Sequence, residues 1–120
     1  MKVLVVEDEE LIRQIVADAL EDAGFEVIEA ATGEEALSRC KEHIADVLFT
    51  DIRLPGRIDG WDVAEHCRQV DPQIPVVYAT GHSLAEHRPV SGSRFFLKPY
   101  RTATIIEAIR DLLGRRPAPA

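Results

Sequence analysis

The sequence predicts an α/β protein built on a doubly wound parallel sheet. Strand-length apolar runs alternate along the chain with segments of helical periodicity, five times in succession. Such βα units require right-handed crossovers, which place helices on both faces of a parallel sheet. At 120 residues, 46% of them hydrophobic, the chain is long enough for one domain with a substantial core.

The first two strands differ in character. Val3–Val6 is entirely apolar, as expected of a central strand that is buried on both faces. A one-sided apolar stripe over 11–23 then predicts a helix, and Gly24 ends it at a typical C-terminal position. Phe25–Glu29 alternates between apolar and polar residues, which is typical of a strand at the edge of a sheet.

The middle of the chain repeats the pattern. Thr32 and Glu35 have the spacing of a capping box and predict the start of a helix that runs through Cys40. Asp46–Thr50 is a third strand, and a loop rich in proline and glycine follows it. A third helix is predicted around Trp61, which we expect to pack near the end of the sheet.

The last third contains two more strands and one clear helix. Ile74–Ala79 is a fourth strand and Phe95–Leu97 a short fifth one. Thr102 is placed to cap a final helix with an apolar inner face. The interval from Gly81 to Arg94 has few apolar residues, so we expect a fourth helix that is short or disordered, with at most one or two turns around 84–88 and a mobile segment. The domain is expected to span 1–116, with a disordered tail at 117–120.

Composition excludes several functional classes. The formal net charge of −7 argues against direct binding to nucleic acid. The apolar run near Met1 is too short for a signal peptide or a membrane span, so we expect a soluble, cytoplasmic protein without a membrane partner. Cys40 and Cys67 lack metal-ligand spacing, and we expect both to be buried, reduced thiols.

Polar residues with complementary chemistry follow four of the predicted strands. Glu7-Asp8 follows the first strand, Asp51 the third, Thr80 the fourth and Lys98 the fifth. Because parallel strands end at one rim, these side chains are expected to converge there. Clustered carboxylates call for a divalent cation, and the lysine suggests an anion beside it. The pattern indicates phosphoryl chemistry at Asp51.

These residues resemble the receiver domains of two-component response regulators. The resemblance covers nearly the whole chain and rests on motifs in a fixed order at strand ends, namely Glu7-Asp8, Asp51, Pro55, Asp59-Gly60, Thr80 and Lys98-Pro99. It implies a flavodoxin-like (βα)5 fold with strand order 2-1-3-4-5. It also implies a protein that acts as a phosphorylation-dependent switch in signal transduction.

Site roles follow from the resemblance, position by position. Asp51 resembles the phospho-acceptor, and Thr80 and Lys98 resemble the residues that bind its phosphoryl oxygens. The resemblance implies that Mg²⁺ is bound by Glu7, Asp8, Asp51 and the backbone carbonyl of Arg53. Phe95 matches an aromatic switch residue. Gly81 and His82 are expected to modulate the lifetime of the phosphorylated state.

The chain departs from the usual family pattern in two spacings. The interval from Asp51 to Gly60 is one residue longer than usual, which predicts a bulge around Gly56. The interval from Thr80 to Lys98 is several residues shorter. With the sequence Tyr78-Ala-Thr-Gly81, the second departure resembles a single-domain subgroup partnered with HWE-type histidine kinases.

The resemblance implies phosphoryl transfer to Asp51 from a sensor histidine kinase or a histidine phosphotransferase, and an effect exerted on an unknown downstream protein target. Such a domain is a switch with intrinsic autophosphorylation and autodephosphorylation rather than a turnover enzyme. Two alternatives stay open: a Mg²⁺-dependent phosphohydrolase with an aspartyl nucleophile, and a receiver-like interaction module that is never phosphorylated. Arg53 weakens the first, because an acid/base aspartate is usual at that position. The intact set of Glu7, Asp8, Thr80 and Lys98 weakens the second.

Overall fold

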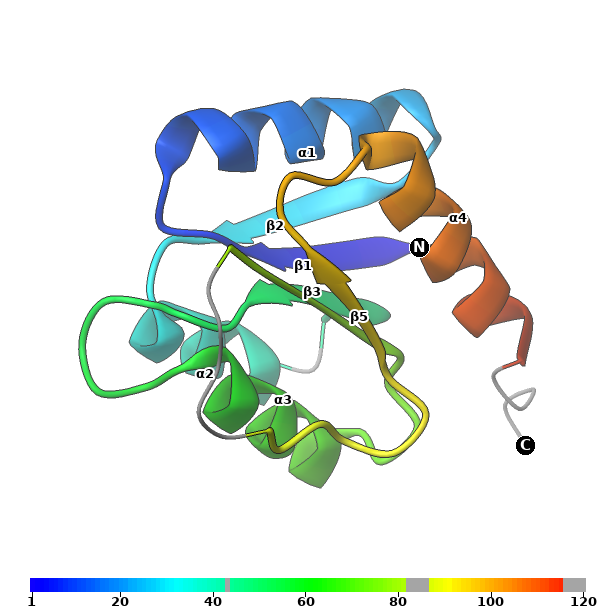
Figure 1. Ribbon diagram of the computed structural model, residues 1–120. Helices are drawn as coiled ribbons and strands as arrows, with labels where there is room; N and C mark the ends of the chain where they lie inside the picture. The colour runs from blue at the N-terminus through cyan, green and yellow to red at the C-terminus, as the bar shows by residue number, and fades with distance from the viewer. Residues whose placement is uncertain (43, 82–86, 116–120) are drawn as a thin grey trace.

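The computed structural model describes residues 1–42, 44–81 and 87–115. Five parallel strands form one sheet in the order β2-β1-β3-β4-β5, which confirms the predicted fold class and strand order (Figure 1). In chain order the elements are β1 (Lys2–Val6), α1 (Glu10–Asp22), β2 (Glu26–Ala30), α2 (Gly33–Lys41), β3 (Val47–Asp51), α3 (Gly60–Val70), β4 (Val76–Thr80), β5 (Arg94–Leu97) and α4 (Thr102–Arg115).

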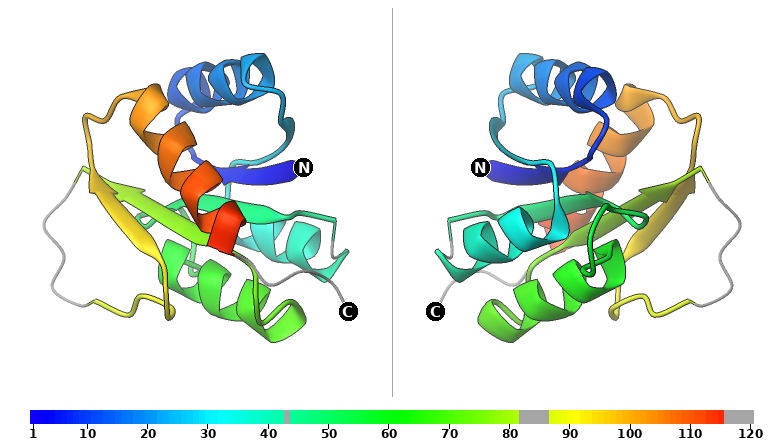
Figure 2. Two further views of the ribbon diagram at one scale, coloured as in Figure 1. Left: turned by 90° about the vertical axis from the view of Figure 1, so that its right-hand side faces the viewer. Right: turned by 90° about the vertical axis from the view of Figure 1, so that its left-hand side faces the viewer.

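The helices cover the sheet in pairs. α1 and α4 lie on one face, and α2 and α3 lie on the other (Figures 1 and 2). β1 shows why both faces need cover, since Val3 and Val5 belong to the cluster under α1 and α4 while Leu4 and Val6 belong to the opposite cluster. The two clusters account for the uninterrupted apolar runs of the central strands.

Three strands begin one or two residues later than predicted. The residues before them make other bonds: the Phe25 N–H donates to Leu20 O (3.0 Å) at the end of α1, and the Ile74 N–H donates to Asp71 O (3.1 Å) in the turn after α3. β3 starts at Val47 and ends on Asp51 itself. The phospho-acceptor candidate is therefore the last residue of a strand and not the first residue of a loop.

The helix starts correct two further predictions. Thr32 does cap α2, since its side chain accepts from the Glu35 N–H (3.1 Å). The Glu35 carboxylate, however, accepts from the Ala31 N–H (3.4 Å), so the reciprocal capping box is not formed. Thr102 is the first residue of α4 rather than its cap.

Between β4 and β5 the described residues 87–93 form no helix. The one or two turns predicted around 84–88 fall largely on residues 82–86, which lie outside the described residues, as does the predicted tail at 117–120. None of the helices in the described ranges has the length and apolar character needed to cross a bilayer.

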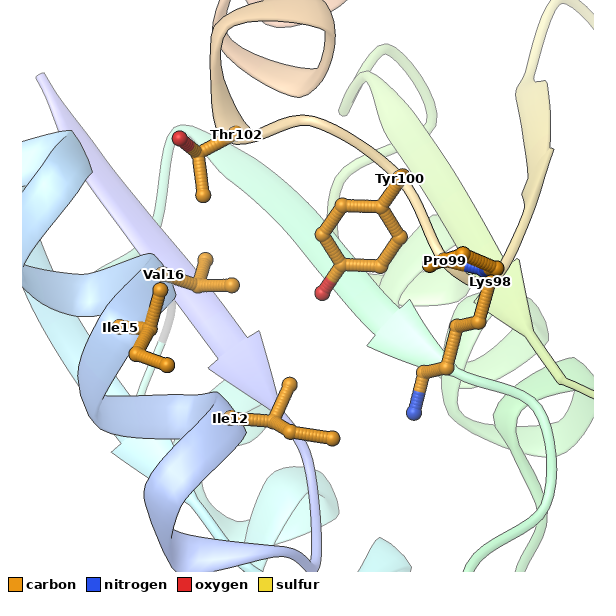
Figure 3. Close-up of a pocket in the computed structure, with 7 residues that line it drawn as sticks. All are labelled: Ile12, Ile15, Val16, Lys98, Pro99, Tyr100 and Thr102. Atoms are coloured by element: carbon orange, nitrogen blue, oxygen red, sulfur yellow. The ribbon is translucent and has the colours of Figure 1, made fainter.

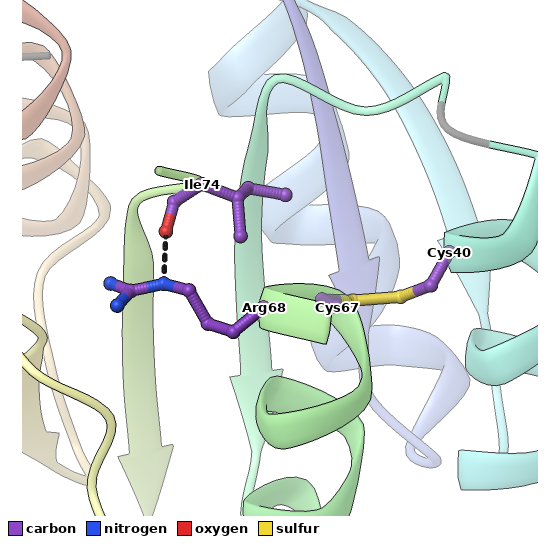
Figure 4. Close-up of a disulfide and its surroundings, with 4 residues drawn as sticks. All are labelled: Cys40, Cys67, Arg68 and Ile74. Carbon is purple, nitrogen blue, oxygen red and sulfur yellow. Dashed lines mark hydrogen bonds between the residues drawn. A yellow bond between two sulfur atoms is a disulfide. The ribbon is translucent and has the colours of Figure 1, made fainter. Parts of the chain in front are cut away.

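The expectation of two reduced thiols is wrong. Cys40 of α2 and Cys67 of α3 form a disulfide, with their Cα atoms 5.3 Å apart (Figure 4). α2 and α3 lie side by side on one face of the sheet, so their inward-facing cysteines meet although 27 residues separate them in sequence. The spacing of the two cysteines carried no signal of this pairing, because it depends on how the helices pack.

Candidate functional site

The predicted polar residues do converge at one rim of the sheet. Val6 is paired with Thr50, so the residues that follow them, Glu7 and Asp51, lie side by side at the ends of neighbouring strands. Asp51 is paired in turn with Ala79, and Thr80 with Leu97. The register of three strand pairs thus brings Glu7, Asp51, Thr80 and Lys98 to adjacent positions, as the sequence predicted.

Lys98 binds two of the acids directly. Its Nζ donates to Glu7 Oε1 (2.6 Å) and to Asp51 Oδ2 (2.8 Å). The carboxylates are buried, with 4% of Glu7 and 8% of Asp51 exposed. Buried charges are stable only when paired, so the ammonium compensates both carboxylates at once.

The other oxygen of Asp51 stands apart. Asp51 Oδ1 is buried and accepts no hydrogen bond from the described residues. Asp8 is exposed beside it, and ligand atoms of Glu7, Asp8 and Asp51 all lie within 4.8 Å of one another. Hard divalent cations such as Mg²⁺ prefer carboxylate oxygens. The donor set and the unsatisfied oxygen therefore fit a bound Mg²⁺.

Burial and charge shift the pKa values of the site. Burial, partly offset by the Lys98 hydrogen bond and reinforced by the negative charge of Asp51, raises the pKa of Glu7 to about 7. Burial alone would lower the pKa of Lys98, but its hydrogen bonds to Asp51 and Glu7 outweigh that effect and raise it above its ordinary value. The lysine is therefore charged at neutral pH, while Glu7 can hold a proton.

Thr80 and Gly81 lie next to this ion pair. Thr80 ends β4 and is fully buried, and its carbonyl accepts from the Lys98 N–H (2.8 Å). A Cβ added at Gly81 would meet Lys98 Cβ at 3.7 Å, an ordinary contact, so packing by itself does not demand glycine there. Arg53 is exposed in the loop after β3. His82 lies outside the described residues.

The loop after Asp51 depends on glycine. A Cβ at Gly60 would collide with Asp51 O and meet Ile52 Cα at 2.7 Å. The Gly60 N–H donates to Ile52 O (2.8 Å), so the start of α3 packs directly on the strand that carries Asp51. Gly56, around which the bulge of this long loop was predicted, has φ +88°, a backbone conformation that favours glycine.

Phe95 lies on the inner side of β5. Its half-buried ring stacks on Trp61 of α3, with ring centroids 6.4 Å apart, and it also contacts His87 (5.7 Å). Trp61 is buried and packs edge-on against Tyr78 (4.7 Å), which agrees with the packing role expected of it. Phe95 is therefore turned toward the core in this structure.

An apolar groove of about 370 Å³ opens beside Lys98, between α1 and the β5–α4 connection (Figure 3). Its lining residues are Ile12, Ile15, Val16, Lys98, Pro99, Tyr100 and Thr102. The Tyr100 hydroxyl points into it, and burial raises the pKa of this hydroxyl to about 12. The Lys98–Pro99 peptide bond is cis.

One residue not identified from the sequence is Arg13, which contacts the loop after β1 that carries Glu7 and Asp8. Arg13 of α1 donates from Nη1 to the Glu7 carbonyl oxygen (2.8 Å). On a helix whose apolar stripe is the dominant signal, an arginine looks like part of the solvent face. Only its position one and a half turns after the acid pair could have suggested a contact.

Comparison with known proteins gives a consistent result. Residues 3–110 match the family model described as the response regulator receiver domain. The chain is 33% identical to the polar-differentiation response regulator DivK of Brucella anthropi, over 93% of this chain and 95% of that protein. It is 31% identical to the probable transcriptional regulator ycf27 of Porphyridium aerugineum, of which it spans only 48%.

Solved structures agree with the sequence comparisons. A response regulator receiver protein from Sinorhizobium medicae superposes with a TM-score of 0.93 at 34% identity, over 98% of this chain and 97% of that one. The response regulator TrrA of Thermotoga maritima, solved in complex with Mg²⁺ and BeF, superposes with a TM-score of 0.82 at 27% identity, over 92% of this chain and 97% of that one.

Proposed function

Since the chain belongs to the response regulator receiver domain family, we propose that Asp51 accepts a phosphoryl group in a Mg²⁺-dependent reaction. The donor would be a sensor histidine kinase or a histidine phosphotransferase. Phosphorylation would then change the contacts of this protein with a downstream protein. One observation carries the proposal: Lys98 binds Asp51 Oδ2, while Asp51 Oδ1 is buried and accepts no hydrogen bond within the described part of the chain, and Asp51 lies in one cluster with Glu7 and Asp8.

The arrangement suits attack by Asp51 on phosphorus. One oxygen of the Asp51 carboxylate would form the new P–O bond as the P–N bond to the donor histidine breaks, and the histidine keeps the bonding electron pair. Bound through Glu7, Asp8, Asp51 and the Arg53 carbonyl, Mg²⁺ would supply positive charge against the repulsion between carboxylate and phosphoryl oxygens. Lys98 adds a fixed positive charge where the equatorial oxygens gather negative charge.

The same residues provide a way to sense the product. The Thr80 hydroxyl would donate to a phosphoryl oxygen, a bond that exists only in the phosphorylated state, so it shifts a two-state equilibrium. Phe95, packed on Trp61, is the side chain that would respond. Gly81, His82 and Arg53 would tune the lifetime of the acyl phosphate. We also propose that the short β4–β5 interval places the chain with receivers of HWE-type kinases.

The protein acts as a signalling switch and not as a classical enzyme. We propose in addition that it phosphorylates itself from small phosphodonors and dephosphorylates itself. We propose a cytoplasmic location, in keeping with a kinase partner. We propose that the protein binds neither nucleic acid nor a membrane directly.

The test uses the purified chain with acetyl phosphate, with and without Mg²⁺, and reads the intact mass. The expected result is a single phosphoryl adduct that needs Mg²⁺, is absent in Asp51→Asn and is retained in the control Asp111→Asn, which alters an exposed carboxylate on α4. Repeated turnover of small phosphate esters would instead indicate a phosphohydrolase. No adduct and no response to beryllofluoride would leave only an interaction module and overturn the proposal.

A further inference from the structure

Arg13 ties the acid-bearing loop to two other elements. Its Nη1 donates to the Glu7 carbonyl oxygen (2.8 Å), and its Nε donates to Glu29 Oε1 of β2 (3.1 Å). The side chain is only 16% exposed. A guanidinium offers several donors in one rigid plane, so a single side chain can bind a backbone carbonyl and a carboxylate together.

These contacts hold the peptide that joins two of the acids. The Glu7 N–H donates to Ala30 O (3.1 Å), so β2 holds one side of the residue and Arg13 the other. The Glu7 side chain also accepts from the Glu9 N–H (3.2 Å). Because the peptide unit is planar, a fixed Glu7 carbonyl also fixes the nitrogen and Cα of Asp8.

Asp8 needs such support more than its neighbours do. Glu7 and Asp51 are buried and bound by Lys98, whereas Asp8 is exposed. Its carboxylate nevertheless lies in the same cluster, with ligand atoms within 4.8 Å of the other two. For an exposed side chain, the direction of its Cα–Cβ bond decides how often the carboxylate occupies that place.

We infer that Arg13 is a positioning residue for the magnesium site: by holding the peptide between Glu7 and Asp8, it keeps the Asp8 carboxylate within reach of the other two acids. The inference rests on the proposed magnesium-dependent function. Groups that orient metal ligands from behind typically change metal affinity 10- to 100-fold when removed.

The experiment compares Mg²⁺ affinity by calorimetric titration in the wild type, Arg13→Met and Arg13→Lys. Arg13→Met keeps much of the stem and loses both donors, so its dissociation constant for Mg²⁺ should rise about 10-fold or more. Arg13→Lys keeps the charge but has one nitrogen for two acceptors. Its dissociation constant for Mg²⁺ should lie between those of the wild type and Arg13→Met. A second readout without metal is the amide resonance and hydrogen exchange of Asp8, which should change in Arg13→Met.

Two controls separate positioning from other effects. Arg94→Met removes an arginine of matched charge that pairs with Asp111 (3.3 Å) at the other end of β5 from Lys98, and should leave Mg²⁺ affinity unchanged. Glu29→Gln removes the charge partner on β2 and keeps an acceptor for Arg13, so it should weaken affinity far less than Arg13→Met.

The outcomes also separate the two proposals. A wild type that binds no Mg²⁺ would end the proposed function, and this inference with it. A wild type that binds Mg²⁺, with Arg13→Met and Arg13→Lys folded and equal to it in affinity, would overturn the positioning role alone. Lower stability of Arg13→Met with unchanged affinity and an unchanged Asp8 amide would mean that the arginine merely supports the fold.

Discussion

At the residue scale, the Glu7 carboxyl is subject to opposing electrostatic effects. It is buried, lies close to the negative charge of Asp51, and has the Lys98 ammonium as its compensating charge. Burial raises its pKa to about 7 from 4.5, so the folded protein holds a proton that the unfolded chain releases at lower pH. A carboxylate kept in this condition is ready for a further positive charge, which is what a bound cation provides.

The Glu7 carboxyl should therefore make stability fall as pH rises. Its contribution is fully present below pH 4.5 and is lost as pH passes through about 7. In the presence of a chelator, we expect wild type to lose roughly 2–3 kcal/mol relative to Glu7→Gln between pH 4.5 and 8.

Urea unfolding at several pH values measures this difference. Glu107→Gln, which alters an exposed carboxylate on α4, serves as the control. Its unfolding free energy should change with pH in parallel with that of the wild type. Wild-type and Glu7→Gln curves that also stay parallel would contradict the raised pKa.

Gly60 and Gly114 make a matched pair for a second test. Alanine at Gly60 meets the backbone of Ile52 at 2.7 Å and should cost about 1–3 kcal/mol in unfolding free energy. Alanine at Gly114, on an exposed turn of α4 with nothing within 4 Å, should add about 0.5–1 kcal/mol. Chemical denaturation of both variants measures whether the two changes in unfolding free energy have opposite signs. An unchanged unfolding free energy in Gly60→Ala would show that the loop after Asp51 can shift to accommodate the added methyl group.

At the element scale, α2 and α3 form one unit under the site. The start of α2 packs against the β3–α3 loop, where a Cβ at Gly33 would meet Ile58 Cγ2 at 2.6 Å. α3 begins with a reciprocal capping box, in which Asp59 accepts from the Asp62 N–H (2.9 Å) and Asp62 accepts from the Asp59 N–H (3.1 Å). The Cys40–Cys67 disulfide joins the two helices near their C-terminal ends. The pair is held at both ends.

The disulfide should contribute measurably to stability. It closes a loop between residues 27 apart, and restricting the unfolded chain in this way is worth about 3.5 kcal/mol. Unfolding free energies measured with and without dithiothreitol should differ by an amount of this order. The Cys40→Ala/Cys67→Ala double variant should not respond to the reductant. Two thiols open to alkylation in the unfolded, unreduced protein would contradict the pairing.

At the scale of the whole molecule, the parallel sheet brings the polar residues of the candidate site to one rim. The protein as a whole has a formal net charge of −7. An overall negative potential attracts cations, and the rim with Glu7, Asp8 and Asp51 is where ligand atoms are close enough to share one. Cation binding to the native state alone must then stabilise the entire fold.

Mg²⁺ should raise the free energy of unfolding by about 1.4 kcal/mol at ten times its dissociation constant. Sodium chloride at matched ionic strength is the control, because screening alone also relieves repulsion in an acidic protein. Asp8→Asn should abolish the gain and leave metal-free stability nearly unchanged, since Asp8 is exposed. An equal gain from sodium chloride would mean that screening, and no specific site, is responsible.

Much of this architecture could be predicted from local pattern. The apolar periods identified the five strands and the four helices of the described residues, with the strand bounds correct to within one or two residues, because buried positions recur with the period of the element that carries them. The positions of Glu7, Asp51, Thr80 and Lys98 at the rim followed from their places after strands, since parallel strands share one end. The functional roles of these four residues stay predictions, as do those of Asp8, Arg53, Gly81, His82 and Phe95.

What the sequence alone determined is therefore which residues stand at strand ends and which face of each helix is apolar. Only the tertiary structure decided that Lys98 binds one particular oxygen of Asp51, that Cys40 meets Cys67, and that Arg13 reaches the Glu7 carbonyl. These contacts join elements remote in the chain, and their geometry depends on how helices lie across the sheet. No periodicity within a segment encodes that lateral placement.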